Sequence, residues 1–517
     1  MKILVVSLLR IGDFFQQIPH LRALGENHEV HVLVNESLRP VTELFPEFRY
    51  HFFPRERLQT FLTSPNCNLL AAFEELRGLC EALRLESFQE IQNWTHNFLS
   101  TRLMDLLQAP VKTGAQFQDG ELVRARGAET YLNDVWGPSR RPSFQWMDAV
   151  QMAVKSPRAG LLGADNHRHG PVYLQIFTSD EKKNWPQDRW LQLARDIREL
   201  GEDVRILCAP FELEKMLVDF YAFRVEVLDW RDLQQALSRA KLVISGDTSI
   251  VHLAALCRAP ILGLYLGSAD PYKTAPRQSG ARVLWPEVAC APCRHSEMCG
   301  QRRHLCSESL NVQTVYNEVV AMMGHGTKSI KISNVRGFEV LPGISARPLL
   351  AEAGQGLEQI WAQLVWEFYL GRDHEQNVAP YGSAARLMTQ KVVSTKSLRA
   401  WTETLNHKLE KTDEILEDLS FLIWNDLKTI GTQNDGMASD TQVRLLTESL
   451  RLLWPKTDFF HRLVDSMQVS DENRFLKLKN RKEALREATE LVLIQKNLTR
   501  RMTQELSERE DNHGARA

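Results

Sequence analysis

Residues 241–267, KLVISGDTSIVHLAALCRAPILGLYLG, contain two apolar runs on either side of a short helical pattern. This order predicts a strand, a helix and a second strand, which together form the repeating unit of a parallel sheet. Asp247 or Thr248 is placed to cap the helix. The same helix start also offers free backbone N–H groups to an anion at the carboxyl end of the first strand. Both interpretations are open on this stretch alone.

The same alternation extends on both sides of this stretch. Upstream, the runs PVYLQIF (171–177) and DVRILCA (203–209) are separated by a helical pattern. In the first third of the chain, ILVVSL (3–8) and EVHVLV (29–34) alternate with helical segments in the same way. The Pro-, Gly- and Arg-containing residues 137–170 are typical of a linker or long loop with one helix inside it. Two Rossmann-like domains joined in this way would place a cleft between the carboxyl ends of their sheets.

Beyond these domains, apolar residues recur at helical spacing in LEQIWAQLVWEF and DEILEDLSFLIWNDLKTI. Such stripes are typical of packed helix faces rather than of cofactor contacts. We therefore predict an α/β protein with a mostly α-helical C-terminal domain, divided into residues 1–165, 166–330 and 340–517.

Composition narrows the class of protein. The 517 residues are too many for one compact core. The chain is 43% hydrophobic and 25% charged, with a mean hydropathy of −0.31, as in soluble globular proteins. A net charge of −2 gives no global case for nucleic-acid binding. The opening MKILVVSLLR is closed by Arg10 without a cleavage site, so it is better interpreted as a buried strand than as a signal peptide. We expect a cytoplasmic protein, with any membrane contact restricted to peripheral association with the inner membrane.

The segment LLRIGDFFQQIP joins the first predicted strand to the first predicted helix. Gly12 permits a tight turn there, and Asp13 follows at the start of the helix. Asp13 is either a helix cap or a carboxylate that faces the cleft and acts as a base. The G-x-G-x-x-G fingerprint is absent, which counts against a dehydrogenase.

Two further segments follow predicted strands of the second domain. In FTSDEKKNWPQDRW, Thr178, Ser179 and Lys183 could bind phosphate oxygens, the lysine adding a positive charge beside a leaving group. The simpler interpretation is a solvated loop that caps the next helix. In CAPFELE, Glu212 or Glu214 could accept hydrogen bonds from a ribose.

Four of the eight cysteines form the pattern C-x2-C-x5-C-x6-C, at Cys290, Cys293, Cys299 and Cys306. The opening C-x2-C has the spacing of a zinc knuckle, but the second pair does not repeat it. The irregular spacing favours reduced structural thiols, with a zinc site as the alternative.

Together these motifs resemble glycosyltransferase family 9, the bacterial heptosyltransferase family, over about residues 1–325. Five stretches carry the likeness in the family's order: LRIGDFFQQIPHLRAL, QNWTHNFLST, TSDEKKNWPQDRW, LVISGDTSIVHLAAL followed by GSADP, and the Cys-rich CAPC segment. The resemblance implies the GT-B architecture, two Rossmann-like domains facing across a cleft. It also implies an ADP-heptose donor held by residues 166–330 and a lipopolysaccharide inner-core acceptor, a glycolipid or saccharide, held by residues 1–165.

The resemblance also implies roles for single residues. Asp13 matches the family's catalytic base, and Lys183 matches the lysine that neutralises the diphosphate. The remaining matches concern donor binding: Thr178, Ser179, Glu212, Asp247, Thr248, Ser249 and His252. Glu214 is an alternative to Glu212. Ser249 replaces the glycine of the family's Asp-Thr-Gly-x-x-His motif.

The leading hypothesis is an inverting glycosyltransferase that needs neither metal nor cofactor, since the sequence has no D-x-D motif. Ser249 and His96 depart from the family pattern and support a second hypothesis. In that hypothesis the α/β region only binds a nucleotide sugar, and the helical C-terminal domain binds a partner. A scaffold stabilised by zinc at the cysteine cluster is the third.

Overall fold

The computed structural model divides the chain into two compact units. The first unit comprises Met1–Thr130, Gln145–Pro342 and Ala346–Ala353, and the second comprises Tyr131–Phe144, Gly343–Ser345 and Gly354–Ala517. The residues that the structure describes are 1–63, 67–95, 97–118, 121–123, 145–324 without 158, 167, 287 and 294–297, 335–342, 348–351, 395–428 and short helical pieces within 443–503.

The first lobe of unit one is built on a parallel sheet in the order β3-β2-β1-β4-β5. These strands are β1 (Lys2–Ser7), β2 (Glu29–Asn35), β3 (Arg49–Phe53), β4 (Glu90–Asn93) and β5 (Val111–Thr113). The apolar run Ile3–Val6 makes β1 the buried central strand, as expected for a strand covered on both faces. The other elements of this lobe are α1 (Ile11–Gly25), α2 (Arg39–Thr42), α3 (Arg55–Thr63), α4 (Leu69–Leu85), α5 (Phe98–Leu106), β6 (Gln116–Gln118) and β7 (Glu121–Val123).

The second lobe has a sheet in the order β11-β10-β9-β12-β13-β15-β16-β17, parallel as far as β15. Its strands are β9 (Val172–Gln175), β10 (Val204–Leu207), β11 (Arg224–Glu226), β12 (Leu242–Gly246), β13 (Ile261–Leu264), β15 (Arg282–Pro286), β16 (Val335–Pro342) and β17 (Pro348–Ala351). A small separate pair is formed by β8 (Leu162–Gly163) and β14 (Gln278–Ser279). The helices are α8 (Gln187–Glu199), α9 (Trp230–Arg239), α10 (Ser249–Leu256), α11 (Pro271–Thr274), α12 (Leu305–Ser309) and α13 (Val312–Met322).

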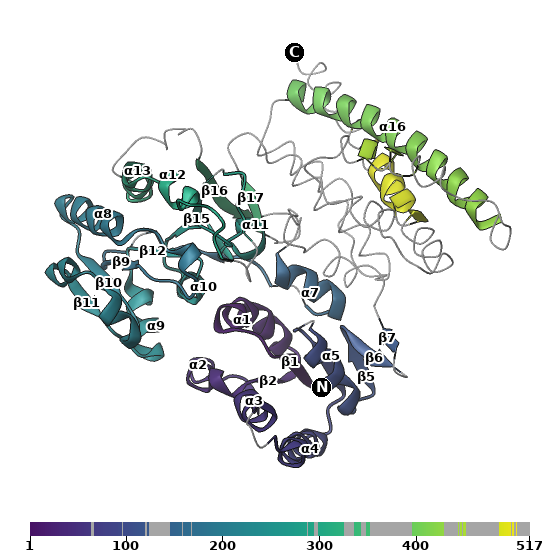
Figure 1. Cartoon of the computed structure of the whole chain (residues 1–517), viewed down its shortest axis with the longest axis horizontal. Coiled ribbons are helices and arrows are strands. Elements are labelled where there is room, and N and C mark those ends of the chain that lie inside the picture. The colour runs from purple at the N-terminus through teal and green to yellow at the C-terminus, as the bar shows by residue number, and fades with distance from the viewer. Residues whose placement is uncertain are drawn as a thin grey trace, which may run out of the picture. The chain divides into compact units, whose positions relative to one another are not determined.

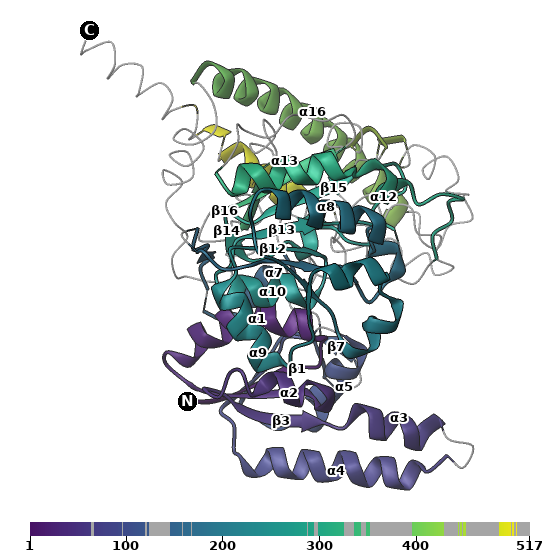
Figure 2. The same ribbon diagram turned by 90° about the vertical axis from the view of Figure 1, so that its left-hand side faces the viewer.

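Both sheets reverse their strand order beside their first strand, between β1 and β4 and between β9 and β12. In open α/β sheets, ligands bind outside the carboxyl ends of the strands at such a point. Helix α1 starts after β1 and α10 starts after β12, and the two helices lie side by side (Figures 1 and 2). The predicted α/β class with two Rossmann-like lobes is confirmed.

The helix expected inside residues 137–170 is α7 (Trp146–Val154). Asp148 on α7 forms a buried ion pair with Arg277 of the second lobe, at 2.8 Å. The preceding Gln145 donates its side-chain N–H to the carbonyl oxygen of Ala275. Helix α7, upstream of the expected boundary at 165, thus contacts the second lobe, and the division between the two lobes stays a prediction.

The segment from residue 340 also differs from its helical interpretation at its start. Strands β16 and β17 extend the second sheet as antiparallel strands, with Phe338 and Val340 buried. The long helix α16 (Thr395–Lys428) agrees with the prediction and buries Leu416 and Leu419. The first predicted apolar stripe, residues 357–368, lies outside the described residues. Among the helices that the structure describes, none combines the length and apolarity needed to cross a bilayer.

Candidate functional site

A pocket of about 1090 Å³ opens at the carboxyl ends of β9, β10 and β12. Three chain segments that directly follow these strands form most of its wall, and Ile11 is the contribution of the first lobe. Five predicted donor-binding residues line it: Thr178, Ser179, Glu212, Thr248 and Ser249. The arrangement follows from the sheet topology, since loops after parallel strands meet at one edge.

The start of α10 shows which residue caps this helix. The hydroxyl oxygen of Thr248 accepts a hydrogen bond from the backbone N–H of Ile250 at 3.2 Å. Thr248 is therefore the N-cap, and Asp247 is available for another contact. The Oδ2 atom of Asp247 accepts a hydrogen bond from Nζ of Lys183 at 2.7 Å, and both side chains are nearly buried. Lys183 and Asp247 thus form an ion pair, and neither residue lines the pocket.

Thr178 forms hydrogen bonds within the loop that follows β9. The Thr178 hydroxyl donates to the backbone carbonyl of Asp180 at 2.7 Å, and the Thr178 N–H donates to Oδ1 of Asn184 at 2.8 Å. Ser179 is exposed at the pocket wall. Ser179 is therefore better placed than Thr178 to offer its hydroxyl to a ligand.

The two glutamates that sequence left as alternatives differ in position. Glu212 lines the pocket, and its Oε2 accepts a hydrogen bond from the backbone N–H of Ala209 at 2.7 Å. Glu214 is exposed and is not part of the pocket wall. The geometry favours Glu212 as the carboxylate that a ligand in the pocket would meet.

Asp13 lies on the first turn of α1, where its carboxyl interacts electrostatically with Asp247 and Lys183. Burial raises the pKa of the Asp13 carboxyl above its ordinary value, and the negative charge of Asp247 raises it further. A backbone hydrogen bond from Arg10 and the positive charges of Arg10 and Lys183 oppose this shift in pKa. A carboxylate with a raised pKa is a better proton acceptor than an ordinary one.

A glycine lets the two lobes approach closely at this point. A Cβ atom on Gly12 would lie 3.3 Å from Cδ2 of His252 and 3.6 Å from Cα of Ser249. Further along α1, Nε2 of Gln16 is 3.4 Å from Nε2 of His252. The contact between the starts of α1 and α10 therefore places Asp13 next to residues of the second lobe.

His252 is buried at this contact, and burial lowers the pKa of its imidazole to about 4. A lowered pKa means that the folded state favours the neutral ring, so stability is lost as the pH falls from about 6.5 toward 4. We expect the free energy of unfolding to fall by about 2 kcal/mol between pH 7 and 5 from this group alone. Chemical unfolding at both pH values should show a smaller loss in His252→Gln. An equal loss in both proteins would contradict this assignment.

The four clustered cysteines are free thiols: Cys306 is buried, and Cys290, Cys293 and Cys299 are partly exposed. Burial raises the pKa of Cys293 and of Cys306, which favours protonated thiols. Counting only described residues, no three of these sulfurs lie within 4.8 Å of one another. A zinc site here stays a prediction. His96 lies outside the described residues.

Sequence reasoning missed Trp230, which begins α9 and lines the pocket. Its ring packs edge-to-face on Phe15 of α1, with ring centroids 5.7 Å apart. Phe211 and Leu228 add further apolar wall. Only Phe211 directly follows a predicted strand, where cleft residues are expected, whereas Leu228 and Trp230 follow β11, which the sequence analysis did not predict.

These residues can be compared with those of known proteins. Residues 149–302 match the model of Glycosyltransferase family 9 (heptosyltransferase). This stretch, called the family 9 region below, is similar to that family. It includes every predicted donor-binding residue and Lys183, whereas Asp13 precedes it. The resemblance predicted from the motifs is confirmed.

Two curated relatives match part of the chain. Lipopolysaccharide heptosyltransferase 1 of Escherichia coli strain K12 is 35% identical over 106 residues, covering 19% of this chain and 32% of that protein. The protein of the same name from E. coli O18:K1:H7 strain RS218 gives the same identity and coverage. The chain thus matches about a third of the length of these relatives.

Solved structures cover more of the chain at lower identity. The E. coli heptosyltransferase WaaC with ADP-2-deoxy-2-fluoro heptose is 16% identical, with a TM-score of 0.44, covering 62% of this chain and 99% of that one. The glycosyl transferase family 9 structure from Veillonella parvula DSM 2008 is 16% identical, with a TM-score of 0.46, covering 63% of this chain and 97% of that one.

Proposed function

We propose that the protein is an inverting, metal-independent glycosyltransferase that moves a heptose from ADP-heptose to a lipopolysaccharide-core-like acceptor. One observation carries this proposal: the start of α1, which carries Asp13, contacts the start of α10 at Gly12, and Asp13 there interacts electrostatically with the Lys183–Asp247 pair, near the pocket of the family 9 region. A base and a cation are thus near each other, as transfer from a nucleotide sugar requires.

In this mechanism, Asp13 accepts the proton of an acceptor hydroxyl while that oxygen attacks the anomeric carbon. The bond from the anomeric carbon to the diphosphate oxygen breaks, and ADP leaves with additional negative charge. Attack from the face opposite the leaving group inverts the anomeric centre. Lys183 and the N-terminal backbone of α10 stabilise the charge on the departing diphosphate.

Lys183 is paired with Asp247, so a bound diphosphate must compete with this carboxylate. A fixed lysine supplies the charge that a divalent ion supplies in other transferases. For this reason the proposed reaction needs no metal ion.

The pocket accommodates the nucleotide part of the donor. Its volume is at the upper end of the range for small-molecule sites. Trp230, Phe211 and Leu228 form an apolar wall for a base, and Glu212 is placed to accept hydrogen bonds from the ribose.

The first lobe would meet a glycolipid acceptor. At the start of α4, Leu69, Leu70 and Phe73 are each exposed by more than 60%. Exposed apolar side chains clustered in this way are typical of an interaction surface. They favour a peripheral contact between this cytoplasmic enzyme and the inner membrane that carries the acceptor.

Calorimetric titration with ADP, followed by transfer assays with ADP-heptose, tests the proposal. We expect Glu212→Gln to weaken ADP binding about tenfold, because a charged hydrogen-bond acceptor for the ribose is lost. Glutamine retains an acceptor for the N–H of Ala209, so the loop should keep its shape. The matched control is Glu214→Gln, which should leave ADP affinity unchanged.

The ADP titration and the transfer assays have three distinguishable outcomes. ADP binding with transfer supports the enzyme. ADP binding without turnover of any nucleotide sugar supports the alternative of a binding protein whose helical domain engages a partner. Absence of ADP binding would exclude both.

A further inference from the structure

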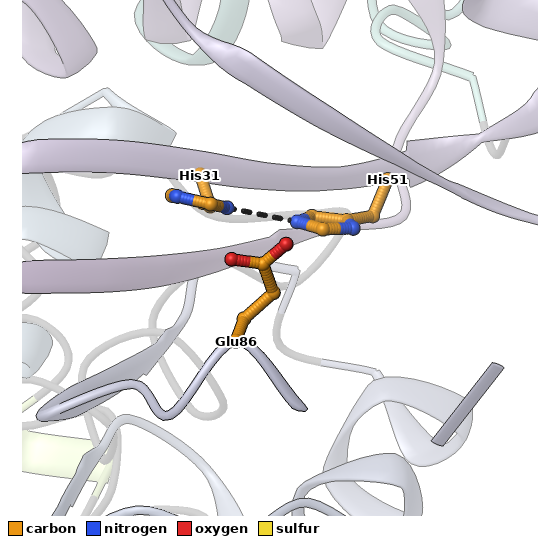
Figure 3. A group of neighbouring side chains, drawn as sticks. All are labelled: His31, His51 and Glu86. Carbon is orange, nitrogen blue, oxygen red and sulfur yellow. Dashed lines mark hydrogen bonds between the residues drawn. The ribbon is translucent and has the colours of Figure 1, made fainter. Parts of the chain in front are cut away.

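Two histidines and a glutamate lie together in the first lobe, toward the amino ends of its strands and away from the carboxyl ends, where the cleft is expected. His31 is on β2, His51 is on the adjacent β3, and Glu86 directly follows α4 (Figure 3). Helix α4 leads into the start of β4, so this cluster is near the amino ends of the strands. The catalytic proposal uses none of the three residues.

Their potential ligand atoms converge. Nδ1 of His31 is 2.9 Å from Nε2 of His51, and one atom from each of the three side chains lies within 4.8 Å of the others. Figure 3 shows the Glu86 carboxylate directed at the two imidazole rings. The rings are stacked, with centroids 5.2 Å apart, and Phe88 packs edge-on against both. His31 is fully buried, so this geometry is held by the core.

Neighbouring charged side chains orient two of the three residues, His31 and Glu86. Nε2 of His31 lies 3.2 Å from Oε1 of Glu29, so a proton on Nε2 would leave the Nδ1 lone pair facing His51 and Glu86. A carboxylate that orients a histidine in this way is typical of metal sites. Lys2 donates to Oε2 of Glu86 at 2.9 Å, and the second oxygen of that carboxylate remains to coordinate an ion.

We propose that His31, His51 and Glu86 form a site for a divalent transition metal of the zinc class, with solvent completing the coordination. Two imidazole nitrogens and one carboxylate oxygen are a donor set that Zn²⁺ prefers. Tetrahedral coordination needs the facing nitrogens about 3.3 Å apart, which requires only a small opening of the present contact. On binding, His51 carries its proton on Nδ1 instead of Nε2, so both facing nitrogens present lone pairs.

The site would connect three parts of the acceptor lobe. Strands β2 and β3 and the turn between α4 and β4 would share one ion. Its role is then structural, because the ligands lie away from the pocket.

Binding of Co²⁺ and Zn²⁺ to the metal-free full-length protein tests this site. The background is Cys290→Ser/Cys293→Ser, which disables the cysteine cluster as a competing site. We expect one Co²⁺ per chain, with a spectrum that lacks thiolate charge-transfer bands. His51→Gln and Glu86→Gln should each weaken binding about 100-fold or more, and Glu29→Gln about tenfold, as for loss of an orienting carboxylate. His169→Gln, at an exposed histidine outside the cluster, should change nothing.

Thermal unfolding separates ligation from misfolding. Zn²⁺ should raise the melting temperature of the background protein and raise that of His51→Gln much less, while the two melt alike without metal. Equal Co²⁺ affinity in the background protein, His51→Gln and Glu86→Gln would overturn the proposal. Loss of all binding in the cysteine double variant would do so as well.

Discussion

Replacing Asp13 by Asn is expected to lower the rate of sugar transfer by about 10²–10⁴-fold, the usual contribution of a general base. The amide has nearly the same shape as the carboxylate but cannot accept the proton of the acceptor hydroxyl. Binding of ADP should be nearly unchanged, because Asp13 does not line the nucleotide pocket. Transfer assays with ADP-heptose and calorimetry with ADP measure the two effects separately.

The raised pKa of Asp13 adds a second readout. Because the folded protein favours the protonated acid, stability is lost as the pH rises above the ordinary aspartate value of 3.8 and the group ionises. The neutral Asp13→Asn variant should therefore be at least as stable as the wild type at pH 7. In the wild type, the acid limb of kcat/KM should lie above pH 3.8, since the base must be ionised to act.

The matched control is Glu47→Gln, which removes an exposed carboxylate paired with Arg22 of the same helix as Asp13. It should leave turnover unchanged. Near-normal transfer by Asp13→Asn would remove Asp13 from its catalytic role, and reduced stability in that variant would contradict the stated cause of its pKa shift.

Replacing Lys183 by Met is expected to lower kcat/KM about 10²–10³-fold, comparable to losing one preorganised donor at a developing negative charge. Methionine keeps the apolar stem but loses the ammonium group beside the diphosphate. Lys182→Met is the matched control, because the adjacent Lys182 pairs with Asp180 and not with Asp247. Steady-state transfer kinetics on the two variants compare the effects.

Loss of Lys183 also leaves the buried Asp247 without its ion-pair partner. The positive charge of Lys183 lowers the pKa of Asp13 and the negative charge of Asp247 raises it, so the acid limb should move to higher pH in Lys183→Met. Adding Asp247→Asn should return the acid limb toward the wild-type position without restoring the rate. A double variant with wild-type kcat/KM would show that Lys183 only neutralises Asp247.

The sequence predicted those features that depend only on residues close to one another along the chain. The strand–helix–strand pattern of 241–267 requires only local periodicity, and it became β12, α10 and β13. The choice between Asp247 and Thr248 as the cap was not local, because it depends on Lys183 engaging Asp247 from another loop. Trp230 was missed for a similar reason, since its position depends on Phe15 of the other lobe.

Two other features had no sequence motif to reveal them. Strands β16 and β17 complete a sheet through β15, far upstream, and the surrounding helical composition obscured their alternating pattern. His31, His51 and Glu86 are spaced irregularly along the chain, and only the pairing of β2 with β3 and the end of α4 bring them together.

The tight contact at Gly12 distinguishes substitutions at the contact itself from substitutions elsewhere in the first lobe. Because a Cβ atom at position 12 would lie 3.3 Å from the His252 ring and 3.6 Å from Cα of Ser249, the approach of the start of α1 to the start of α10 requires a glycine there. Substitutions in the outer helices of the first lobe would leave this contact, and with it the geometry proposed for sugar transfer, unaltered.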